Sequence, residues 1–567
     1  MGRLYQWRVA DVAPTDLNER YPELLPIAVQ MLANREITEQ ADVDQFINPD
    51  YGRDQHDPML FRDMGKAVER IVLAVERGEK IIVHGDYDAD GVCASAVLYL
   101  TLKEIGADLD VYIPHRDTEG YGLNMNTVNA LHAEQAKLII TVDCGISNAP
   151  EVERAAELGI DVIITDHHSQ PPQLPTAALA IINPKLDEET YPFKFLAGVG
   201  VSFKLCQALI AHYKLGEAYE KWLLDLVAIS TVTDFVELIG ENRVLLKYGL
   251  IVLQKNRRLG LRKLFEAMGV EAASADAQTI GFKLGPHINA AGRVKHANMA
   301  FELVVQDKES QAVEEAAALV KTNKERQAMS QRMSKQAIAQ AELQRDEYVI
   351  IVESDDWPVG LVGLVAGKVA SDFHRPTLVI TKMGKEMVGS GRSIEHFNMI
   401  EGLQSMDELF TKYGGHPMAC GFSLNSEDNL DELKTRIREA AREKLEGRDL
   451  RNFLKIEAVL DLHQTNWELV DIARQFAPYG QANPEPIFLT RGVTVKDFSC
   501  VGKTKDHLKM TVEDQGLTRQ CIAFKCGEFA EALMPGVKID IAYAISVNEW
   551  NGNREIQLII KDIEIMQ

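Results

Sequence analysis

Ile81-Ile82-Val83-His84-Gly85-Asp86-Tyr87-Asp88-Ala89-Asp90-Gly91 is the stretch that decides the fold of this chain. Its three apolar residues predict a buried strand, which runs into a loop with three carboxylates. Gly91 ends the loop, and the residues after it predict a helix whose first amides would point toward a ligand. A strand, an acidic loop and a helix in this order form the first half of a βαβ unit.

The same arrangement occurs twice more along the chain. Leu138–Val142 precedes Asp143-Cys144-Gly145, and Val162–Thr165 precedes Asp166-His167-His168. Because strands and helices alternate in this region, we expect βαβ crossovers and a parallel sheet. The carboxyl ends of parallel strands converge on one crevice, where ligands bind. Two later segments place similar residues at the ends of apparent strands, namely Asp234 and Gly414-Gly415-His416.

A crevice that holds several carboxylates and two imidazoles is destabilised by like-charge repulsion unless cations occupy it. Asp88 and Asp90 share one face of the extended segment, because side chains alternate with a period of two. Asp143 and Asp234 supply further carboxylates, and oxygen ligands together with imidazole suit Mn²⁺ or Mg²⁺. We therefore predict a hydrolytic site with two divalent ions, which needs no serine or cysteine nucleophile.

Three other residues of these segments receive separate interpretations. His167 is expected to bind metal, whereas His168, which should point differently, is better placed to hydrogen-bond a phosphate. Asp86 is left out of the ligand set, because three acids within five residues exceed what one metal face needs.

Each motif alone has an ordinary structural explanation. An acidic loop such as Asp86–Asp90 is also typical of a solvated turn or of a Ca²⁺ loop. Asp166-His167-His168 is also typical of a capping cluster, and Asp143 of a helix N-cap. Their occurrence together, in order and each after an apolar run, favours the metal site.

Composition sets wide limits on the rest of the chain. With 567 residues, 46% of them apolar, the chain should form roughly three to four domains. The formal net charge of −23 disfavours a polyanionic partner, although bound metals would neutralise part of it. Basic clusters also occur, and each of them is equally explained by a solvated face: residues 255–258, 262–263, 321–326 and 503–509.

The sequence shows no signal peptide and no apolar run near the ~18 residues of a membrane span. Its seven cysteines are scattered without a Cys-x-x-Cys pair. This pattern predicts free thiols in a reducing compartment and argues against a zinc cluster. We therefore expect a cytoplasmic protein with no membrane partner.

The pattern predicts an α/β protein with a parallel-sheet domain, a long connecting helix, a second α/β domain and a C-terminal OB-like β-barrel that binds nucleic acid. The long helix is predicted because glycine and proline are absent between Gly292 and Pro358, where Ala, Glu, Gln and Lys are frequent. It should bridge two domains, with a coiled-coil partner site as the alternative. The expected parts are a helical segment at 1–75, a catalytic domain at 76–300, the helix at 301–346, the second domain at 347–447 and the barrel at 450–567.

These motifs resemble those of the DHH phosphoesterase superfamily, and most closely its RecJ-type members, which are single-strand-specific 5′→3′ DNA exonucleases. The acidic loop and Asp166-His167-His168 are common to all DHH enzymes. The segment Asn289-Ala290-Ala291-Gly292-Arg293, the long helix and the barrel point to the RecJ type. Further matching segments are Ile113–Arg116, Glu119–Leu123, Leu196–Gly200, Glu241–Arg243, Gly389–Ser393, Gly414–Ala419 and Pro478–Gly480.

The resemblance implies a set of metal ligands and a set of substrate contacts. Two Mn²⁺ or Mg²⁺ ions would be held by His84, Asp88, Asp90, Asp143, His167 and Asp234. The catalytic residues would be Asp88, Asp90, Asp143 and His168. The 5′-terminal phosphate and the neighbouring backbone would be bound by Arg116, His168, Arg293, Ser390, Arg392 and His416. Gripping the 5′ end beside the metals would make the enzyme remove one nucleotide at a time.

Three residues depart from the family pattern. His287 stands where arginine is usual, His115 where asparagine is usual, and Cys420 where alanine is usual. If the usual arginine contacts DNA, His287 predicts weaker or more pH-dependent binding. The other two departures concern fine contacts and not the chemistry.

The sequence therefore predicts a single-stranded-DNA-specific 5′→3′ exonuclease that releases 5′-mononucleotides and acts in DNA repair and recombination. The resemblance also implies a single-strand-binding protein and a helicase as partners. Two alternatives use the same residues. A DHH phosphodiesterase for short oligonucleotides or cyclic dinucleotides needs neither the barrel nor the long helix, and a non-catalytic DNA-binding scaffold would be free to lose ligands.

Overall fold

The computed structural model describes residues 4–384, 386–550 and 552–566. The chain divides into two compact units. The first contains Met1–Asp54, Glu237–Val244 and Arg451–Gln567, and the second contains Gln55–Val236 and Leu245–Leu450. Each unit is considered by itself.

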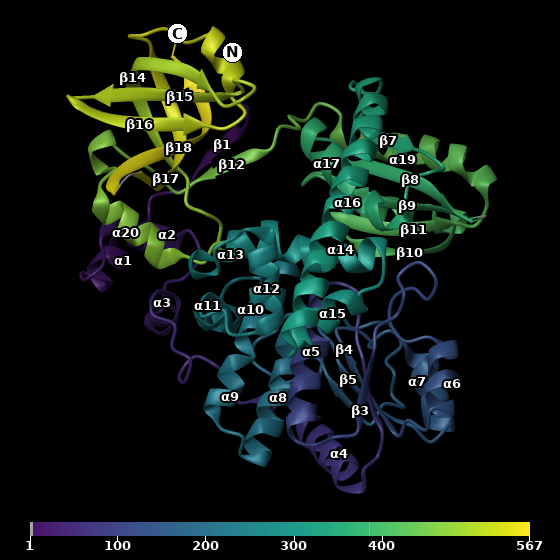
Figure 1. Ribbon diagram of the computed structural model, residues 1–567. Coiled ribbons are helices and arrows are strands. Elements are labelled where there is room, and N and C mark those ends of the chain that lie inside the picture. The colour runs from purple at the N-terminus through teal and green to yellow at the C-terminus, as the bar shows by residue number, and fades with distance from the viewer. Residues whose placement is uncertain (1–3, 385, 551, 567) are drawn as a thin grey trace. The chain divides into compact units, whose positions relative to one another are not determined.

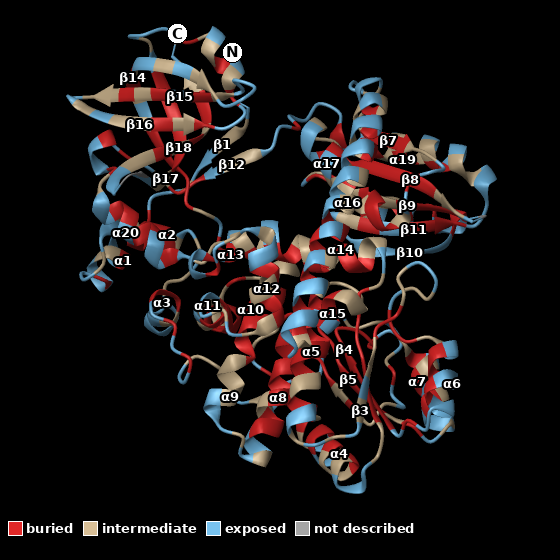
Figure 2. Cartoon of the chain, in the orientation of Figure 1, coloured by how far each residue is buried: buried red, intermediate tan, exposed pale blue. Residues whose placement is uncertain are grey.

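A five-stranded parallel sheet forms the first half of the second unit (Figure 1). Its order is β3-β2-β4-β5-β6, and all four pairings are parallel. Every residue of β2 and β4 is buried (Figure 2), as expected for strands that helices cover on both faces. The strands are β2 (Ile81–His84), β3 (Leu109–Tyr112), β4 (Leu138–Val142), β5 (Asp161–Thr165) and β6 (Ala180–Ile182).

Helices α6 (Met125–Ala133) and α7 (Ala149–Glu157) pack on one face of this sheet, where Ile82, Ile139 and Val162 join their core. Helices α5 (Ala89–Glu104) and α8 (Gly198–Tyr213) contact the sheet as well as each other. They lie on the opposite side from α6 and α7 in Figure 1.

The strand order places a topological switch point between β2 and β4. The chain leaves β2 to form β3 on one side, and then returns to form β4 on the other side. Ligands of open parallel sheets bind at the carboxyl ends of the strands that flank such a point. Here those ends carry the acidic loop and Asp143.

The remainder of this domain is helical and leads into one long helix. Residues 309–342 form α16, whose 34 residues would extend for about 51 Å at 1.5 Å per residue. The other helices of this region are α4 (Met64–Arg77), α9 (Glu217–Trp222), α10 (Leu224–Thr233), α11 (Gly240–Gln254), α12 (Leu259–Met268), α13 (Ala277–Thr279), the π-helix η3 (Ile280–Leu284), α14 (Gly285–Val294) and α15 (Asn298–Val305).

A mixed sheet of order β10-β11-β9-β8-β7 forms the second α/β domain. Only β7 and β8 are parallel, and the other pairs are antiparallel. Helix α17 and the C-terminal half of α16 share a core with β7, while α19 packs in a separate core with β10 and β11. The elements are β7 (Ile350–Glu353), α17 (Val359–Phe373), β8 (Thr377–Met383), β9 (Glu386–Arg392), α18 (Met399–Gln404), β10 (Phe410–His416), β11 (Ala419–Leu424) and α19 (Leu430–Leu445).

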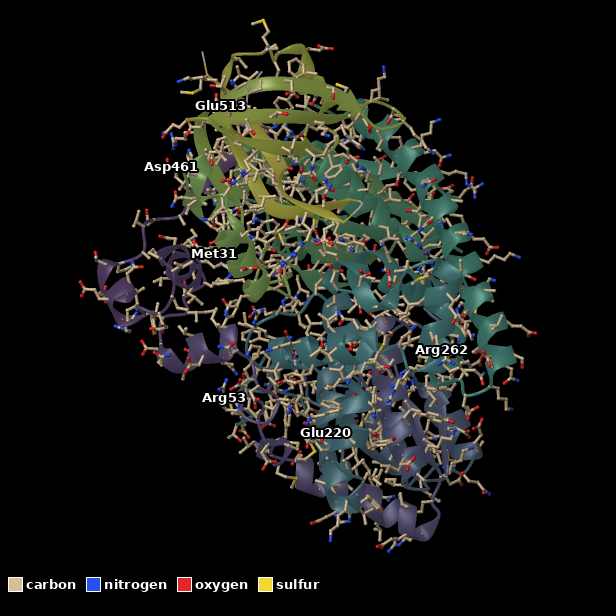
Figure 3. All side chains as sticks on the ribbon, turned by 60° about the vertical axis from the view of Figure 1, so that its left-hand side comes forward. Met31, Arg53, Glu220, Arg262, Asp461 and Glu513 are labelled. Atoms are coloured by element: carbon tan, nitrogen blue, oxygen red, sulfur yellow. The ribbon has the colours of Figure 1, made fainter. Side chains whose placement is uncertain are left out.

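The first unit contains a β-barrel. Strands β14-β15-β16-β18-β17 pair in that order, and β14 also pairs with β17, which closes the ring. Met31 of an N-terminal helix is fully buried in the same core as the barrel interior (Figure 3). The elements are β1 (Gln6–Val9), α1 (Thr15–Arg20), α2 (Pro26–Ala33), α3 (Gln40–Ile47), β12 (Phe453–Ile456), β13 (Ala458–Val459), α20 (Trp467–Phe476), β14 (Phe488–Val501), β15 (His507–Asp514), β16 (Leu517–Ala523), β17 (Lys538–Trp550) and β18 (Asn553–Ile565).

The predicted fold class is confirmed: parallel sheet, long helix, second α/β domain and closed barrel are all present. Two details differ from the sequence prediction. The N-terminal segment is not purely helical, because β1 pairs in parallel with β12. The long helix begins at Glu309 and not at residue 301, because the chain is extended at Gln306, between α15 and α16. The predicted domain limits stay predictions.

Two further sequence-based expectations can be compared with the structure. All seven cysteines are free, as predicted. Within the described residues, no helix combines the length and the apolar character that crossing a bilayer requires.

Candidate metal centre

The acidic loop between β2 and α5 is held from two sides. Asp88 is the N-cap of α5, and its Oδ1 accepts hydrogen bonds from the backbone N–H groups of Asp90 (2.8 Å) and Gly91 (3.1 Å). The N–H of Ala89 donates instead to Oδ1 of Asn289 on α14, at 2.8 Å. The first N–H groups of a helix lack partners within it, so these side chains fix both the helix start and the loop.

Helix α14 contacts this loop a second time and also reaches the second α/β domain. A Cβ atom at Gly292 would collide with the carbonyl oxygen of Tyr87, so the close approach requires glycine. The neighbouring Arg293 donates from Nη1 to the carbonyl oxygen of Gly360, at 3.1 Å, in the first turn of α17. One helix therefore connects the acidic loop to α17.

The N-terminus of α8 binds the carboxylate of Asp90. The N–H groups of Gly198 and Val199 each donate to one of its oxygens at 2.7 Å, and the Ser230 hydroxyl donates as well. Gly198 also lies against Asp143, because a Cβ there would be 2.5 Å from Oδ1 of Asp143. The family-like segment Leu196–Gly200 thus provides backbone donors and space for the acids.

Asp143 follows β4 in the left-handed backbone region, with φ 60°. The buried carboxylate of Asp166 holds two turns in place, namely the turn that follows Asp143 and the turn at His167 and His168. Oδ2 of Asp166 accepts from the N–H of Ile146 at 3.0 Å. Its Oδ1 accepts from the N–H groups of His167 (2.7 Å) and His168 (3.0 Å). The aspartate of the Asp-His-His motif is therefore structural, and the two imidazoles remain available for the site.

His167 brings the separate segments together. Its Nε2 lies 3.3 Å from Oδ1 of Asp143, 3.5 Å from Oδ2 of Asp234 and 3.9 Å from Oδ2 of Asp90. Its neighbour His168 has a different partner, with Nδ1 2.8 Å from Oδ1 of Asp166, and its side chain is 43% exposed. The rings of His167 and His168 nevertheless lie close together, with centroids 4.6 Å apart.

The donor atoms form three groups, each within 4.8 Å: Asp86, Asp88 and Asp143; Asp90, His167 and Asp234; and Asp143, His167 and His168. Asp143 and His167 occur in two groups each, so the groups form one continuous cluster. Five of the six ligands expected from the sequence belong to it.

The sixth expected ligand, His84, is in none of these groups, although its Nε2 is buried without a hydrogen-bond partner among the described residues. Asp86, which the sequence prediction left out, is in one of the groups. The ring of His84 stacks on Tyr112 at 5.5 Å, and its Nδ1 lies 3.7 Å from Sγ of Cys144. A third carboxylate in the same short loop was the available signal for Asp86. The two-residue alternation of side chains holds only within a strand, so it does not predict which way Asp86 points in the loop.

The cluster fits a pair of hard divalent cations. Oδ1 of Asp86, Oδ1 of Asp143 and Nε2 of His167 are buried and have no hydrogen-bond partner among the described residues. Unpaired buried acceptors are costly, and a cation would satisfy them. Carboxylates and imidazole, with no thiolate among the grouped donors, suit Mn²⁺ or Mg²⁺.

The electrostatics agree with this chemistry. Burial, followed by the charge of Asp88, raises the pKa of Asp90 to about 6. Burial and the carboxylates of Asp90 and Asp88 raise the pKa of Asp143 well above its usual range, and Asp234 is affected in the same way. Burial lowers the pKa of His167 to about 3, so its ring is a neutral ligand. Without cations, burial and mutual repulsion therefore disfavour the ionised form of these carboxylates.

Three of the predicted phosphate-binding residues are arginines that act on one another electrostatically: Arg116 after β3, Arg293 on α14 and Arg392 on β9. Burial, followed by the charge of Arg116, lowers the pKa of Arg293 to about 10, and Arg326 and Arg392 act in the same direction. Nη1 of Arg392 lies 3.0 Å from Oγ of Ser390. Arg326 of α16 was expected only as part of a basic cluster.

His416 lies at the exposed end of β10. It pairs with Ala419 of β11, which pairs with Arg392 of β9, so the three residues are in line across the sheet. Directly opposed residues share a face. His416 and Arg392 therefore face the same side.

The three departures from the family pattern occupy ordinary positions. His287 donates from Nδ1 to the carbonyl oxygen of Lys283, at 2.7 Å, within its own helical segment. The ring of His115 lies 5.7 Å from that of His296. Cys420 is buried in the mixed sheet against Gly391.

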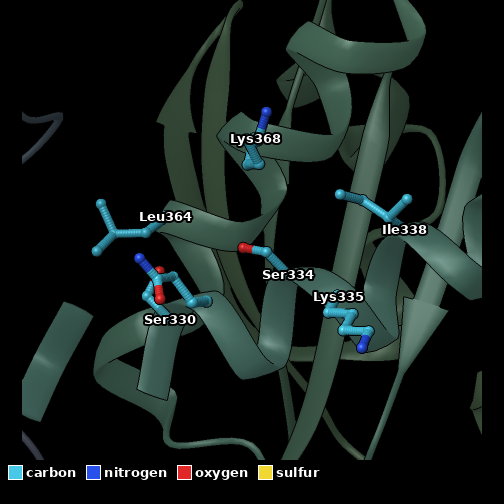
Figure 4. Close-up of a pocket in the computed structure, with 7 residues that line it drawn as sticks. Ser330, Ser334, Lys335, Ile338, Leu364 and Lys368 are labelled. Carbon is cyan, nitrogen blue, oxygen red and sulfur yellow. The ribbon is translucent and has the colours of Figure 1, made fainter. Parts of the chain in front are cut away.

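A groove of about 450 Å³ lies between α16 and α17 (Figure 4). Ser330 begins it one helical turn beyond Arg326, and its other lining residues include Ser334, Lys335 and Lys368. In the first unit, a pocket of about 440 Å³ on the barrel is lined by Trp467, Arg519 and Arg554, among others. Sequence reasoning did not single out Trp467.

Models of three protein families match successive parts of this chain. The DHH family, N-terminal domain, matches residues 80–231; the DHHA1 domain matches residues 346–443; and the RecJ OB domain matches residues 456–562. The chain is 39% identical over 517 residues to the single-stranded-DNA-specific exonuclease RecJ of Bacillus subtilis, covering 91% of this chain and 65% of that protein. It is 36% identical over 529 residues to the RecJ of Escherichia coli, covering 88% of this chain and 89% of that protein.

Solved structures give the same result. The crystal structure of RecJ in complex with Mn²⁺ from Thermus thermophilus matches with a TM-score of 0.85 and 28% identity, over 99% of this chain and 80% of that chain. A crystal structure of exonuclease RecJ bound to manganese matches with a TM-score of 0.60 and 33% identity, over 69% of this chain and 98% of that chain. With 89% of a 36%-identical relative covered and all three domain models matched in order, this chain belongs to the RecJ family of single-stranded-DNA-specific exonucleases.

Proposed function

We propose that this protein is a metal-dependent exonuclease that digests single-stranded DNA from the 5′ end and releases 5′-mononucleotides. The observation that carries the proposal is a buried cluster of carboxylates and imidazole beside a group of arginines. The carboxylates and imidazole would hold the metal ions that hydrolyse the phosphodiester, and the arginines would bind a terminal phosphate.

Two ions of Mn²⁺ or Mg²⁺ would be held by the grouped donors, one by Asp86 and Asp88 and the other by Asp90, His167 and Asp234, with Asp143 between them. Ions there would lower the pKa of a bound water and neutralise charge on the phosphate. His84, whose Nε2 is buried without a hydrogen-bond partner among the described residues, would complete the ligand set expected from the sequence.

His168 would hold an oxygen of the scissile phosphate. The hydrogen bond with Asp166 raises the pKa of His168, although burial alone would lower it. A ring that keeps its proton is a better donor to a phosphate oxygen. Its 43% exposed side chain leaves the other ring edge open to a substrate.

The arginines near the metal centre would determine the 5′→3′ direction of digestion. Arg116, Arg293 and Arg392 offer planar forks that match a terminal phosphate, which carries more charge than an internal one. Ser390 and His416 lie on the same sheet as Arg392 and would complete the grip. A 5′ end held there presents the adjacent phosphodiester to the acids.

The barrel would bind the strand farther from the cut. The Arg554 guanidinium lies 5.4 Å from the centre of the Trp467 ring, beside Arg519 in the barrel pocket. An aromatic face with cations is the combination that binds single strands without sequence preference.

We further propose a cytoplasmic protein that acts in DNA repair and recombination, with a single-strand-binding protein and a helicase as partners. Family membership supports these roles. Seven free cysteines suit a reducing compartment.

The test is digestion of end-labelled oligonucleotides by the full chain. With Mn²⁺, a 5′-labelled single strand should release labelled mononucleotide at once, a 3′-labelled strand should release it last, and a duplex should persist. An intact single strand, or early loss of the 3′ label, would contradict the proposal. Faster cleavage of a dinucleotide than of a long strand would favour the oligonucleotide phosphodiesterase instead. Asp143→Ala should abolish cleavage while DNA binding remains, and an unchanged rate would indicate a scaffold with a contaminating nuclease.

A further inference from the structure

The segment between β3 and α6 carries Glu119-Gly120-Tyr121-Gly122-Leu123, a motif with no role in the function proposed above. It also carries Arg116. Glu119 fixes one end, because its carboxylate accepts from the hydroxyl of Tyr112 and from the N–H of His115, the latter at 2.7 Å. The other end is fixed where Asn148 accepts from the N–H of Leu123 at 3.2 Å.

Tyr121, between these fixed ends, reaches into the metal centre. Its hydroxyl lies 2.9 Å from the carbonyl oxygen of Asp143 and 3.1 Å from Nδ1 of His168. Its ring meets the His168 ring edge-on, with centroids 5.6 Å apart. Tyr121 is thus hydrogen-bonded both to the backbone of Asp143 and to the His168 ring.

These contacts determine where the proton of His168 lies. A carbonyl oxygen can only accept, so the single hydroxyl proton of Tyr121 is directed to Asp143. The lone pairs of Tyr121 then face Nδ1 of His168. The carboxylate of Asp166, 2.8 Å from the same nitrogen, can also only accept. Nδ1 of His168 must therefore carry hydrogen, and Nε2 is the atom left for a substrate.

We propose that Tyr121 is a positioning residue that orients the His168 ring, with Nδ1 toward Tyr121 and Asp166 and Nε2 directed to the scissile phosphate. This inference rests on the proposed nuclease function. It assigns the Glu119–Leu123 motif the task of connecting the Arg116 segment to the phosphate-binding histidine. Tyr121 touches neither the phosphate nor the metals in this role.

Tyr121→Phe tests the proposal, because it removes only the hydroxyl. Tyr219→Phe is the matched control, since the Tyr219 hydroxyl also donates to a backbone carbonyl, that of Leu100 at 2.8 Å, and lies outside the metal centre. Loss of an outer partner of a metal site costs about 10–100-fold. We expect a single-turnover cleavage rate at least tenfold lower for Tyr121→Phe, with oligonucleotide affinity in Ca²⁺ and the unfolding midpoint close to wild type. Tyr219→Phe should retain the wild-type rate, and an equal rate for Tyr121→Phe would overturn the proposal.

A double-mutant cycle with His168→Ala shows whether Tyr121 acts through the histidine. If it does, Tyr121→Phe slows the wild type but has little further effect in the His168→Ala background. The same tenfold loss in both backgrounds would mean that Tyr121 acts independently of His168, and the proposal would fail.

A measurement without substrate separates this inference from the nuclease function. In protein labelled with ¹⁵N-histidine, the His168 signals are assigned by their loss in His168→Ala. We expect the ¹⁵N chemical shift of Nδ1 to change in Tyr121→Phe, because this nitrogen then loses one of its two hydrogen-bond partners and keeps only Asp166. An unchanged chemical shift refutes the role of Tyr121 even if the nuclease is active. An inactive wild type with the expected shift refutes only the nuclease proposal.

Discussion

Replacing Asp143 by asparagine should stabilise the metal-free protein while abolishing its activity. Oδ1 of Asp143 is buried without a hydrogen-bond partner among the described residues. The donor atoms of Asp86, Asp88 and Asp143 all lie within 4.8 Å of one another. At an effective dielectric constant of about 20, two unit charges at that separation repel by about 3.5 kcal/mol. Proton uptake relieves part of this repulsion, so we expect a net gain of about 2 kcal/mol, or a thermal midpoint higher by about 4 °C.

The sign of the pH dependence follows from the pKa of Asp143, which burial and neighbouring carboxylates raise in the folded state. The folded state therefore binds a proton more readily than the unfolded state. The penalty from the charged form is fully present above the folded pKa and fades as the pH falls through it. The advantage of Asp143→Asn should be largest at alkaline pH and shrink as the pH falls toward the ordinary range of a carboxylate.

The assay is thermal unfolding in EDTA and again with Mn²⁺. Mn²⁺ should raise the midpoint of the wild type, because a ligand of the folded state stabilises it, and should leave the variant nearly unchanged. Asp225→Asn is the matched control. Asp225 is also buried, but it is paired with Arg258 at 2.8 Å, and breaking that pair should cost about 3 kcal/mol. If Asp143→Asn lowered the midpoint in EDTA as Asp225→Asn does, repulsion between the carboxylates would not be what destabilises the metal-free cluster.

Three other outcomes are expected. Gly198→Ala places a Cβ 2.5 Å from Oδ1 of Asp143, so it should destabilise the protein by about 1–3 kcal/mol and weaken Mn²⁺ binding in calorimetry. The control Gly367→Ala, where nothing lies within 4 Å of the new Cβ, should be neutral or slightly stabilising. Equal effects of the two substitutions would contradict the steric argument. Arg392→Lys should raise the Michaelis constant about tenfold for a 5′-phosphorylated strand and much less for a 5′-hydroxyl strand, because lysine lacks the planar fork; equal losses on both substrates would place the arginine elsewhere. Since the pKa of Asp90 is raised to about 6, protons should compete with metal below that pH, and Mn²⁺ affinity measured by calorimetry should fall as the buffer is acidified; constant affinity from neutral to acid pH would argue against Asp90 as a ligand.

The sequence predicts the parts of this protein that depend on local pattern. Continuous apolar runs such as Leu138–Val142 indicate strands buried on both faces, and the polar residue after each run marks the edge where the strands converge. The position of His167 and His168 just beyond the end of β5 also follows from local reasoning. These features can be predicted because they depend on residues that are adjacent in the sequence.

Features that depend on distant segments could not be predicted in the same way. Strand β1 has four residues and pairs with β12, which begins at Phe453, so no local signal marks its partner. The choice between His84 and Asp86 depends on which way each side chain turns after β2. The proposed role of Tyr121 in orienting His168 depends on a loop that folds back onto the Asp143 turn. The residues next to Tyr121 in the sequence do not predict that contact.

Helix α14 has a further consequence for the size of the product. It hydrogen-bonds Ala89 through Asn289 and Gly360 through Arg293, so the acidic loop and the start of α17 are attached to the same rigid rod. If the terminal phosphate binds beside Arg293 and the cut occurs beside the loop that Asn289 holds, about one helical turn of α14 fixes the spacing between the two. The length of each excised fragment would then be set by a fixed span of protein, whatever bases pass through it.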